Sequence, residues 1–211
     1  MRPMVAARKL TRRDEYAQAT REAILDAARK LFDERGYFAT KVDDIAAEAR
    51  VAPATVYATS GGKRGLFAEL IRRWSTDPII DITIGSIQAY DDPAEVVREV
   101  ASVTRRLREQ FGDIMRLALT TAPHDRAAAG QVEKATALYR QAFVPIAARL
   151  AQLGALGPDI DVTDAVDILW FNFGYASYFV LCEDNNWSYD RAERWLADQA
   201  IRQLFGQDRV V

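Results

Sequence analysis

The sequence is poor in the residues that most catalytic and metal sites require. Its 211 residues include a single cysteine, Cys182, and a single histidine, His124. It contains no His-Glu-x-x-His zinc motif, no glycine-rich phosphate loop and no Cys/His pair in a suitable setting, although no sequence excludes a pair of catalytic carboxylates. We therefore expect neither an enzyme nor a protein with a metal or another cofactor.

A single cysteine also excludes an internal disulfide, as is typical of a reducing compartment. We interpret Cys182 as a small buried hydrophobic residue and His124, beside a proline, as a surface residue. Long apolar runs are lacking too, because no stretch approaches the roughly 18 uncharged apolar residues of a membrane span. The basic N-terminus has no apolar segment of a secretory signal. These absences predict a cytoplasmic protein without membrane contact.

Charge is distributed unevenly along the chain, although the net charge is only −2. Residues 1–76 hold 15 Lys and Arg against 10 Asp and Glu, whereas the remainder holds 13 against 20. Five cations lie within the first 13 residues: Arg2, Arg8, Lys9, Arg12 and Arg13. This asymmetry indicates a cationic surface for a polyanion in the N-terminal part, but a merely solvated basic tail explains it equally well.

Apolar residues recur at helical spacing, and no alternating strand pattern of useful length competes. They predict a helix whose apolar face extends from Ile24 to Phe32 and which ends at Gly36. A short helix is expected to follow Thr40, because Asp43 three residues later resembles a capping box.

Two more helices are expected before residue 77. Pro53 suits the first turn of a short helix, which ends at Gly61-Gly62. The next helix begins near Lys63 and has a periodic apolar face, formed by Leu66, Phe67, Leu70, Ile71 and Trp74.

Beyond Asp77-Pro78 the predicted helices become longer. Glycine, proline and asparagine breaks place them at about 93–111, 113–121, 126–153, 163–184 and 189–205. We therefore expect an all-α fold with an N-terminal domain at 1–76 and a C-terminal domain at 77–211.

The three N-terminal helices have the lengths and the tight turn of a helix-turn-helix. In this motif the N-terminal part of the second helix of the pair enters the major groove of DNA. Here that recognition helix is expected at about 53–59, with Val56 pointing inward. Its candidate groove-facing residues are Pro53, Ala54, Thr55, Tyr57, Ala58 and Thr59. Hydroxyl groups can donate to phosphates, and the Thr methyl group can pack on a thymine methyl.

Several stretches resemble the tetracycline-repressor (TetR) family. They are the run from Thr20 to Phe32, Gly36-Tyr37, Asp44-Ile45-Ala46, Ala49, Thr55-Val56-Tyr57 and Lys63 with Leu66. The resemblance implies a three-helix domain that binds double-stranded DNA, and a helical C-terminal domain that binds a small-molecule effector and dimerises. It implies phosphate contacts for Tyr57 and Lys63, a base or backbone contact for Thr55, and backbone contacts for Thr40 and Lys41.

Three positions depart from the family pattern. Arg50 replaces a turn glycine, so it must either adopt a positive φ or shift the turn, and it could contact a phosphate. Ala52 replaces a capping Ser or Thr, which costs about 1 kcal/mol. Ser60 replaces a packed Phe, which suggests a void or a mobile loop.

The segment 163–184 is apolar on nearly all sides, so it must be covered on more than one side. Gly174 and Ser177 would allow close approach of another helix. The last helix has a matching periodic face, formed by Ala192, Trp195, Leu196, Gln199 and Gln203. The family resemblance implies that these two helices form a four-helix bundle across a homodimer, whereas a buried helix in a monomer is the alternative.

Pro145 interrupts an apolar helical run and is expected to kink it. A kink near aromatic side chains suits an apolar ligand with one polar group. The candidate ligand-binding residues are Tyr139, Phe143, Trp170, Phe171, Tyr175 and Tyr178, although all of them could simply be core.

Together these features predict a ligand-responsive regulator, a repressor released from a palindromic operator by a largely apolar inducer. The alternative is a helical small-molecule-binding protein whose helix-turn-helix has lost DNA binding. The sequence does not specify the operator or the effector.

Overall fold

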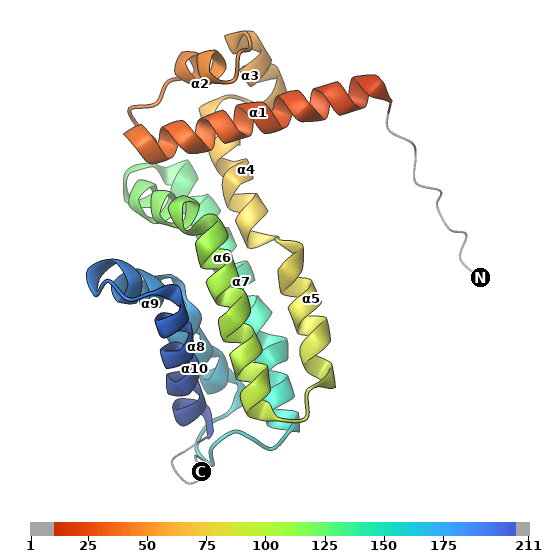
Figure 1. Ribbon diagram of the computed structural model, residues 1–211, viewed down its shortest axis with the longest axis vertical. Coiled ribbons are helices and arrows are strands. Elements are labelled where there is room, and N and C mark those ends of the chain that lie inside the picture. The colour runs from red at the N-terminus through yellow and green to blue at the C-terminus, as the bar shows by residue number, and fades with distance from the viewer. Residues whose placement is uncertain (1–10, 206–211) are drawn as a thin grey trace, which may run out of the picture.

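The computed structural model describes residues 11–205, which contain helices and no strand. Helices α1 to α3 lie at one end of the molecule and α4 leads away from them to the remaining helices (Figure 1). The helices are α1 (Arg12–Arg35), α2 (Val42–Glu48), α3 (Pro53–Ser60), α4 (Lys63–Ser75), α5 (Pro78–Ser86), α6 (Pro93–Thr121), α7 (Arg126–Gln152), α8 (Val162–Phe173), α9 (Tyr175–Phe179) and α10 (Tyr189–Phe205). Two 3-10 turns, Ile87–Ala89 and Ala122–His124, and a π-helical turn, Val180–Asp184, complete the described chain. The all-α prediction is confirmed.

Helix α1 begins within the cluster of N-terminal cations. The Thr11 hydroxyl accepts from the backbone N–H of Asp14, and the Asp14 carboxylate accepts from the backbone N–H of Thr11, which closes a capping box. Arg12 and Arg13 therefore belong to the first helical turn. Arg2, Arg8 and Lys9 lie outside the described residues.

The start of α2 differs from the prediction. The Asp44 carboxylate, and not Asp43, accepts from the backbone N–H of Lys41. Thr40 is 1% exposed, and its hydroxyl donates to the carbonyls of Leu31 and Gly36 at 3.1 and 2.9 Å. Thr40 thus fastens the loop to the end of α1, where the Gly36 carbonyl lies past the last helical residue and has no helical partner.

The turn before α3 follows the sequence closely. Arg50 has a φ of 57°, which is the first of the two alternatives expected where it replaces a glycine. Val56 is fully buried, and Gly61 ends α3 in the left-handed conformation with a φ of 72°. No side-chain hydrogen bond caps α3 at Ala52. The predicted inner face of α4 is also confirmed, with Leu66, Phe67, Leu70, Ile71 and Trp74 all buried.

Three predictions for the second half of the chain were wrong. Helix α5 was not expected. Helix α6 continues through Gly112, because the buried Phe111, Ile114 and Met115 on either side outweigh the roughly 1 kcal/mol cost of a helical glycine. The expected helix 163–184 is interrupted at Gly174, where α8 ends.

Gly174 is needed for this interruption. A Cβ atom at Gly174 would lie 2.4 Å from the carbonyl oxygen of Trp170 in the same segment. The Ser177 hydroxyl donates to the carbonyl of Phe171 at 2.7 Å, so it serves the end of α8. Close approach of another helix at Gly174 and Ser177 stays a prediction.

The segment Val162–Asp184 is long and apolar enough to cross a membrane by length and composition, contrary to the expectation that no stretch approaches this. It is broken at Gly174, and α8 packs against α7 and α10. This packing is that of a core helix, and composition alone is weak support for a span.

Helices α4 and α5 are separated only by Thr76 and Asp77. Helix α4 packs against both α6 and α7, and one continuous cluster of buried residues extends from Ile24 to Phe205. The division into domains at residue 77 stays a prediction.

Candidate functional site

The outer face of α3 consists of small or uncharged side chains. Pro53, Ala54, Tyr57 and Ala58 are exposed, Tyr57 to 58%. Thr55 and Thr59 are half-buried, and the Thr59 hydroxyl donates to the carbonyl of Thr55. Of the six predicted groove-facing residues, four are thus exposed and two are half-buried.

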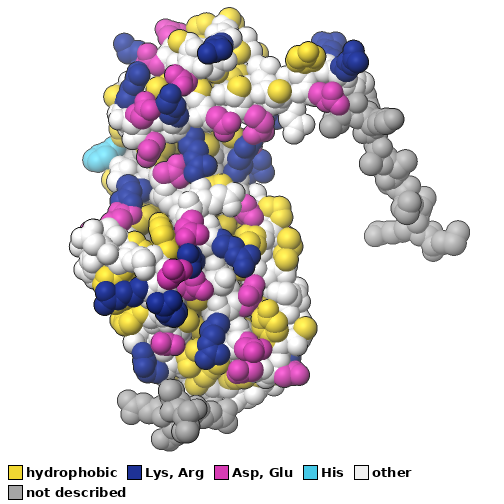
Figure 2. Space-filling model, in the orientation of Figure 1, with side chains coloured by type: hydrophobic (Ala, Val, Ile, Leu, Met, Phe, Trp, Pro, Cys, Tyr) yellow, Lys and Arg dark blue, Asp and Glu magenta, His cyan; other side chains and the backbone are white. Residues whose placement is uncertain are grey.

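Two exposed cations precede this face in the sequence. Lys41 precedes α2 and Arg50 precedes α3, and both side chains are exposed. Neither forms an ion pair within residues 11–205. They are free to meet an external anion. The face of the molecule in Figure 2 carries both cationic and anionic side chains, so these cations are local features of a mixed surface.

The loop after α3 is packed tightly by glycines. A Cβ atom at Gly62, whose φ is 83°, would lie 2.9 Å from the ring of Tyr57. A Cβ atom at Gly65 would lie 1.5 Å from the carbonyl oxygen of Ser60. The Ser60 hydroxyl donates to the carbonyl of Val56 at 2.7 Å. The chain has therefore brought α4 close to the end of α3, where a void or a mobile loop was expected.

Lys63 is bound within the protein. Its ammonium group donates to the carbonyls of Tyr37, Thr40 and Phe38 at 2.9, 3.0 and 3.5 Å, and it lies 4.4 Å from the centre of the Tyr37 ring. Burial lowers the pKa of Lys63. All three ammonium hydrogens have acceptors, so a phosphate contact by Lys63 requires it to give up a carbonyl.

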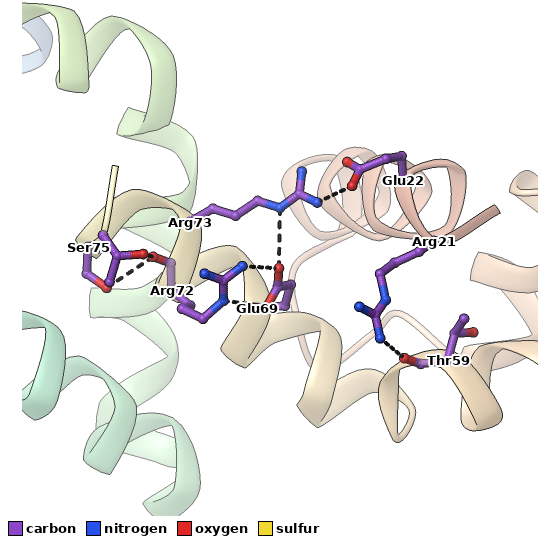
Figure 3. A network of polar contacts seen from close by, with 8 residues as sticks. Arg21, Glu22, Thr59, Glu69, Arg72, Arg73 and Ser75 are labelled. Carbon is purple, nitrogen blue, oxygen red and sulfur yellow. Dashed lines mark hydrogen bonds and ion pairs between the residues drawn. The ribbon is translucent and has the colours of Figure 1, made fainter. Parts of the chain in front are cut away.

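A polar network that the sequence did not predict holds α3 and α4 to α1 (Figure 3). Arg21 donates to the carbonyl of Thr59 at 3.2 Å. Arg73 pairs with Glu22 at 2.6 Å, and this hydrogen bond holds the pKa of Glu22 below its ordinary value. Glu69 joins Arg73 to Arg72. Because these residues lie on faces without a strong apolar pattern, helical periodicity gave no sign of them.

Helix α4 reaches from this network to a cluster of aromatic residues. Its Trp74 ring lies edge-on to Tyr175, with centroids 5.3 Å apart. Tyr175 also contacts Tyr139 and Trp170, and Tyr139 contacts Phe143. Four of the predicted ligand-binding residues, Tyr139, Phe143, Trp170 and Tyr175, are thus neighbours. Desolvation raises the pKa of Tyr175 to about 12.

The other two predicted ligand-binding residues lie elsewhere. Phe171 is 73% exposed, because it is on the side of α8 that faces away from the core. Tyr178 is 1% exposed, stacks on Tyr189 and donates to the carbonyl of Ala101 at 3.4 Å. Neither borders the cavity that Tyr139 and Phe143 line, whereas Phe171 lines an open groove together with Trp170 and Tyr175.

A small apolar cavity of about 40 Å³ lies between α5, α6 and α7. Its lining includes Tyr139 and Phe143, together with Thr104 and Leu107 of α6 and Ile80 of α5. It is much smaller than the several hundred Å³ typical of ligand sites. A ligand would have to enlarge it.

A wider open groove of about 1190 Å³ runs over α8, α9 and α10. Three large apolar side chains are exposed in it: Phe171 at 73%, Val180 at 47% and Trp195 at 42%. Gln199 and Gln203 of the predicted α10 face also line it.

Two comparisons with known proteins agree with this arrangement. Residues 24–70 match the family described as bacterial regulatory proteins, tetR family. The HTH-type transcriptional regulator YdeS of Bacillus subtilis (strain 168), itself uncharacterized, is 28% identical over 164 residues, which cover 72% of this chain and 75% of YdeS.

Solved structures share the whole fold. The SmeT–triclosan complex has a TM-score of 0.74 at 20% identity and covers 92% of this chain and 95% of SmeT. The FadR regulator of Bacillus subtilis in complex with stearoyl-CoA has a TM-score of 0.70 at 18% identity, with 87% and 98% covered. The helix-turn-helix geometry, the family match and the regulator relative agree, and they indicate a regulator and not an enzyme. Residues 24–70 thus match the TetR family of bacterial regulatory proteins, and the fold of the whole chain resembles those of the solved regulators.

Proposed function

We propose that this protein is a cytoplasmic, homodimeric repressor that leaves a palindromic operator when a largely apolar effector binds. The observation that carries the proposal is the path of α4. At its start Lys63 holds the connection between α1 and α2, and near its end Trp74 contacts the aromatic cluster at Tyr175. One rigid helix thus joins the DNA-facing end to the candidate effector site, so a shift at either end is transmitted to the other.

On the DNA side, we assign the exposed Tyr57, Lys41 and Arg50 to phosphate contacts. Pro53, Ala54, Thr55, Ala58 and Thr59 would face the major groove. Because α3 presents methyl and hydroxyl groups and no long cation, base recognition would rely on packing against thymine methyl groups. The buried hydroxyl of Thr40 leaves it only a supporting role.

The dimer would form through α8 and α10. The exposed Phe171 and Trp195 lie in the open groove between these helices, and a partner copy would cover them. A two-fold dimer presents its two recognition helices about one DNA turn, roughly 34 Å, apart, which requires an inverted-repeat operator.

The effector would bind at the aromatic cluster. SmeT and FadR are similar in fold and were solved with triclosan and stearoyl-CoA, of which the first is largely apolar and the second carries a long apolar acyl chain. In this chain Tyr139 and Phe143 border the cavity between α5, α6 and α7, and the enlarged cavity would hold the apolar part of the ligand.

The proposal is tested by titrating the full-length protein with the DNA upstream of its own gene, by fluorescence anisotropy. Replacing the exposed Arg50 by Ala should weaken binding and lower the slope of log affinity against log salt by about 0.9, since one phosphate contact is lost. Arg98→Ala, an exposed arginine of α6, is the matched control and should change neither. Saturable effector binding without any DNA binding would instead favour the alternative, a small-molecule-binding protein.

A further inference from the structure

Arg108 of α6 is a buried cation without a counter-ion. Its side chain is 1% exposed, and no carboxylate within residues 11–205 forms an ion pair with it. One terminal nitrogen donates to the carbonyls of Gly174 and Phe173 at 2.8 and 3.4 Å. The other terminal nitrogen meets the sulfur of Met115, a weak acceptor. The buried Nε atom has no hydrogen-bond partner.

The surroundings of Arg108 compensate its charge only in part. The rings of Tyr139, Tyr175 and Phe179 lie 5.8, 5.5 and 5.8 Å from the guanidinium carbon, where their faces attract a cation. The two carbonyls lie where α8 is interrupted at Gly174, and that of Phe173 also accepts from the Tyr139 hydroxyl at 2.7 Å, so it keeps a donor without Arg108. Two carbonyls and three rings do not replace a carboxylate, and a buried, unpaired charge is costly.

A purely structural role does not account for these features. Satisfying two carbonyls at a helix break requires only a neutral donor. A guanidinium instead offers five donors in a fork that matches a carboxylate, and here one donor, on Nε, is unused.

The apolar cavity lies beside this cation. Tyr139 contacts the Arg108 guanidinium and also lines the cavity, as does Leu107, the preceding residue. A molecule with an acidic group at Arg108 and an apolar body toward Phe143 would satisfy both features at once.

We propose that the effector is an organic anion whose carboxylate or similar acidic group pairs with Arg108 while its apolar part enlarges the cavity between α5, α6 and α7. This inference rests on the proposed function, because it names the chemical class of that effector. Pairing with the anion would draw the guanidinium from the carbonyls of Phe173 and Gly174. The next residue, Tyr175, contacts Trp74 of α4. A movement of the backbone at Gly174 would therefore be transmitted through α4 to the DNA-binding end.

The experiment measures binding of matched acid and alcohol probes to the full-length protein by calorimetry. The pairs are octanoate with 1-octanol and benzoate with benzyl alcohol. In the unaltered protein at least one acid should bind about tenfold more tightly than its alcohol, because only the acid offers a charge-assisted bond. Arg108→Met should remove this preference and Arg108→Lys should keep part of it. Arg106→Met, an exposed neighbour on α6, is the control and should leave it unchanged.

Equal binding of acid and alcohol in every pair, or no binding of either, would overturn the proposal. Thermal unfolding without any probe gives a second readout. Arg108→Met should unfold at the same or a higher temperature, since an unpaired buried charge is removed. A lower unfolding temperature together with an unchanged acid preference would show that Arg108 only supports the helix break. Binding of the operator DNA is measured in parallel without any probe. A protein that does not bind the operator would contradict the proposed function, but not the pairing of an acidic ligand with Arg108.

Discussion

Helices α3 and α4 are started differently from the helices α5 to α8 that follow them. Helices α5, α6, α7 and α8 each begin at an aspartate whose carboxylate accepts a backbone N–H, namely Asp77, Asp92, Asp125 and Asp161. Helices α3 and α4 begin at Ala52 and Gly62, without a side-chain cap. A capped helix is stabilised locally, whereas α3 and α4 depend on contacts from elsewhere in the chain.

Those contacts come from Arg21, Lys63 and Arg73, which hold backbone carbonyls and carboxylates of other segments. The recognition helix is therefore positioned by tertiary contacts that can change when α4 moves. We therefore expect α3 and α4 to change position when an effector binds, whereas the capped helices α5 to α8 keep theirs.

The largest effect is expected from Trp74 of α4, which connects the DNA-binding end to the aromatic cluster through its contact with Tyr175. Trp74→Ala should lower the free energy of unfolding by about 3–5 kcal/mol, because it empties a buried aromatic site. It should also weaken the response of operator binding to the effector, since the contact with Tyr175 is lost. Trp74→Phe is the control that keeps an aromatic ring, and it should retain most of both properties. A full response in a folded Trp74→Ala variant would contradict transmission through α4.

Lys63→Ala tests the hydrogen bonds by which Lys63 fixes the start of α4 to the carbonyls of Tyr37 and Thr40. It should destabilise the protein by about 1–3 kcal/mol, because the partly buried carbonyls of Tyr37 and Thr40 lose their donor. If Lys63 acts only through these carbonyls, the variant should bind every DNA sequence more weakly. The slope of log affinity against log salt should then stay unchanged. A slope reduced by about one would instead place Lys63 on a phosphate. Lys134→Ala, on exposed α7 surface, is the control.

Two glycine substitutions compare the packing of the two regions. Gly65→Ala should cost about 1–3 kcal/mol, because its Cβ would lie 1.5 Å from the Ser60 carbonyl oxygen and the backbone must shift. Gly112→Ala should stabilise α6 by about 0.5–1 kcal/mol, since the nearest atom to its Cβ, the Tyr189 hydroxyl, is 3.9 Å away. Thermal unfolding of both variants checks the opposite signs, and stabilisation by Gly65→Ala would contradict the close approach of α3 and α4.

The smallest effect concerns the missing cap. Ala52→Ser should add a hydrogen bond to a free N–H of α3 and stabilise the protein by about 1 kcal/mol, and Asp92→Ala should remove about the same amount from α6. Operator affinity should rise in Ala52→Ser, because a better ordered recognition helix loses less entropy on binding. Unchanged stability in denaturant titrations of Ala52→Ser would mean that the free N–H already has a solvent partner of equal strength.

The N-terminal helices could be predicted in detail because their signals are local. The positive φ of Arg50, the burial of Val56 and the end of α3 at Gly61 each follow from a residue and its nearest neighbours in sequence. The predicted role of Thr40 in a capping box of α2 was wrong, because its hydroxyl donates to the carbonyls of Leu31 and Gly36 at the end of α1.

The C-terminal helices were harder to predict because packing overrode local signals. Gly112 was expected to end a helix and does not, whereas Gly174 was expected to lie within a helix and ends one. Each glycine directly follows a phenylalanine, so the local sequence does not distinguish a glycine within a helix from one that ends it. The same holds for Phe171, which lies among other aromatic residues in the sequence but has its side chain 73% exposed to solvent.

The sequence by itself determined the all-α class, the helix-turn-helix and the resemblance to the TetR family, because these depend on spacing between residues a few positions apart. The tertiary structure alone decided what the two principal cations do. Lys63 meets carbonyls 23 to 26 residues away, and Arg108 meets carbonyls 65 and 66 residues away. Periodicity carries no information on which carbonyls a distant helix end leaves free, so only the folded chain could show that one cation is saturated and the other still has a donor to offer.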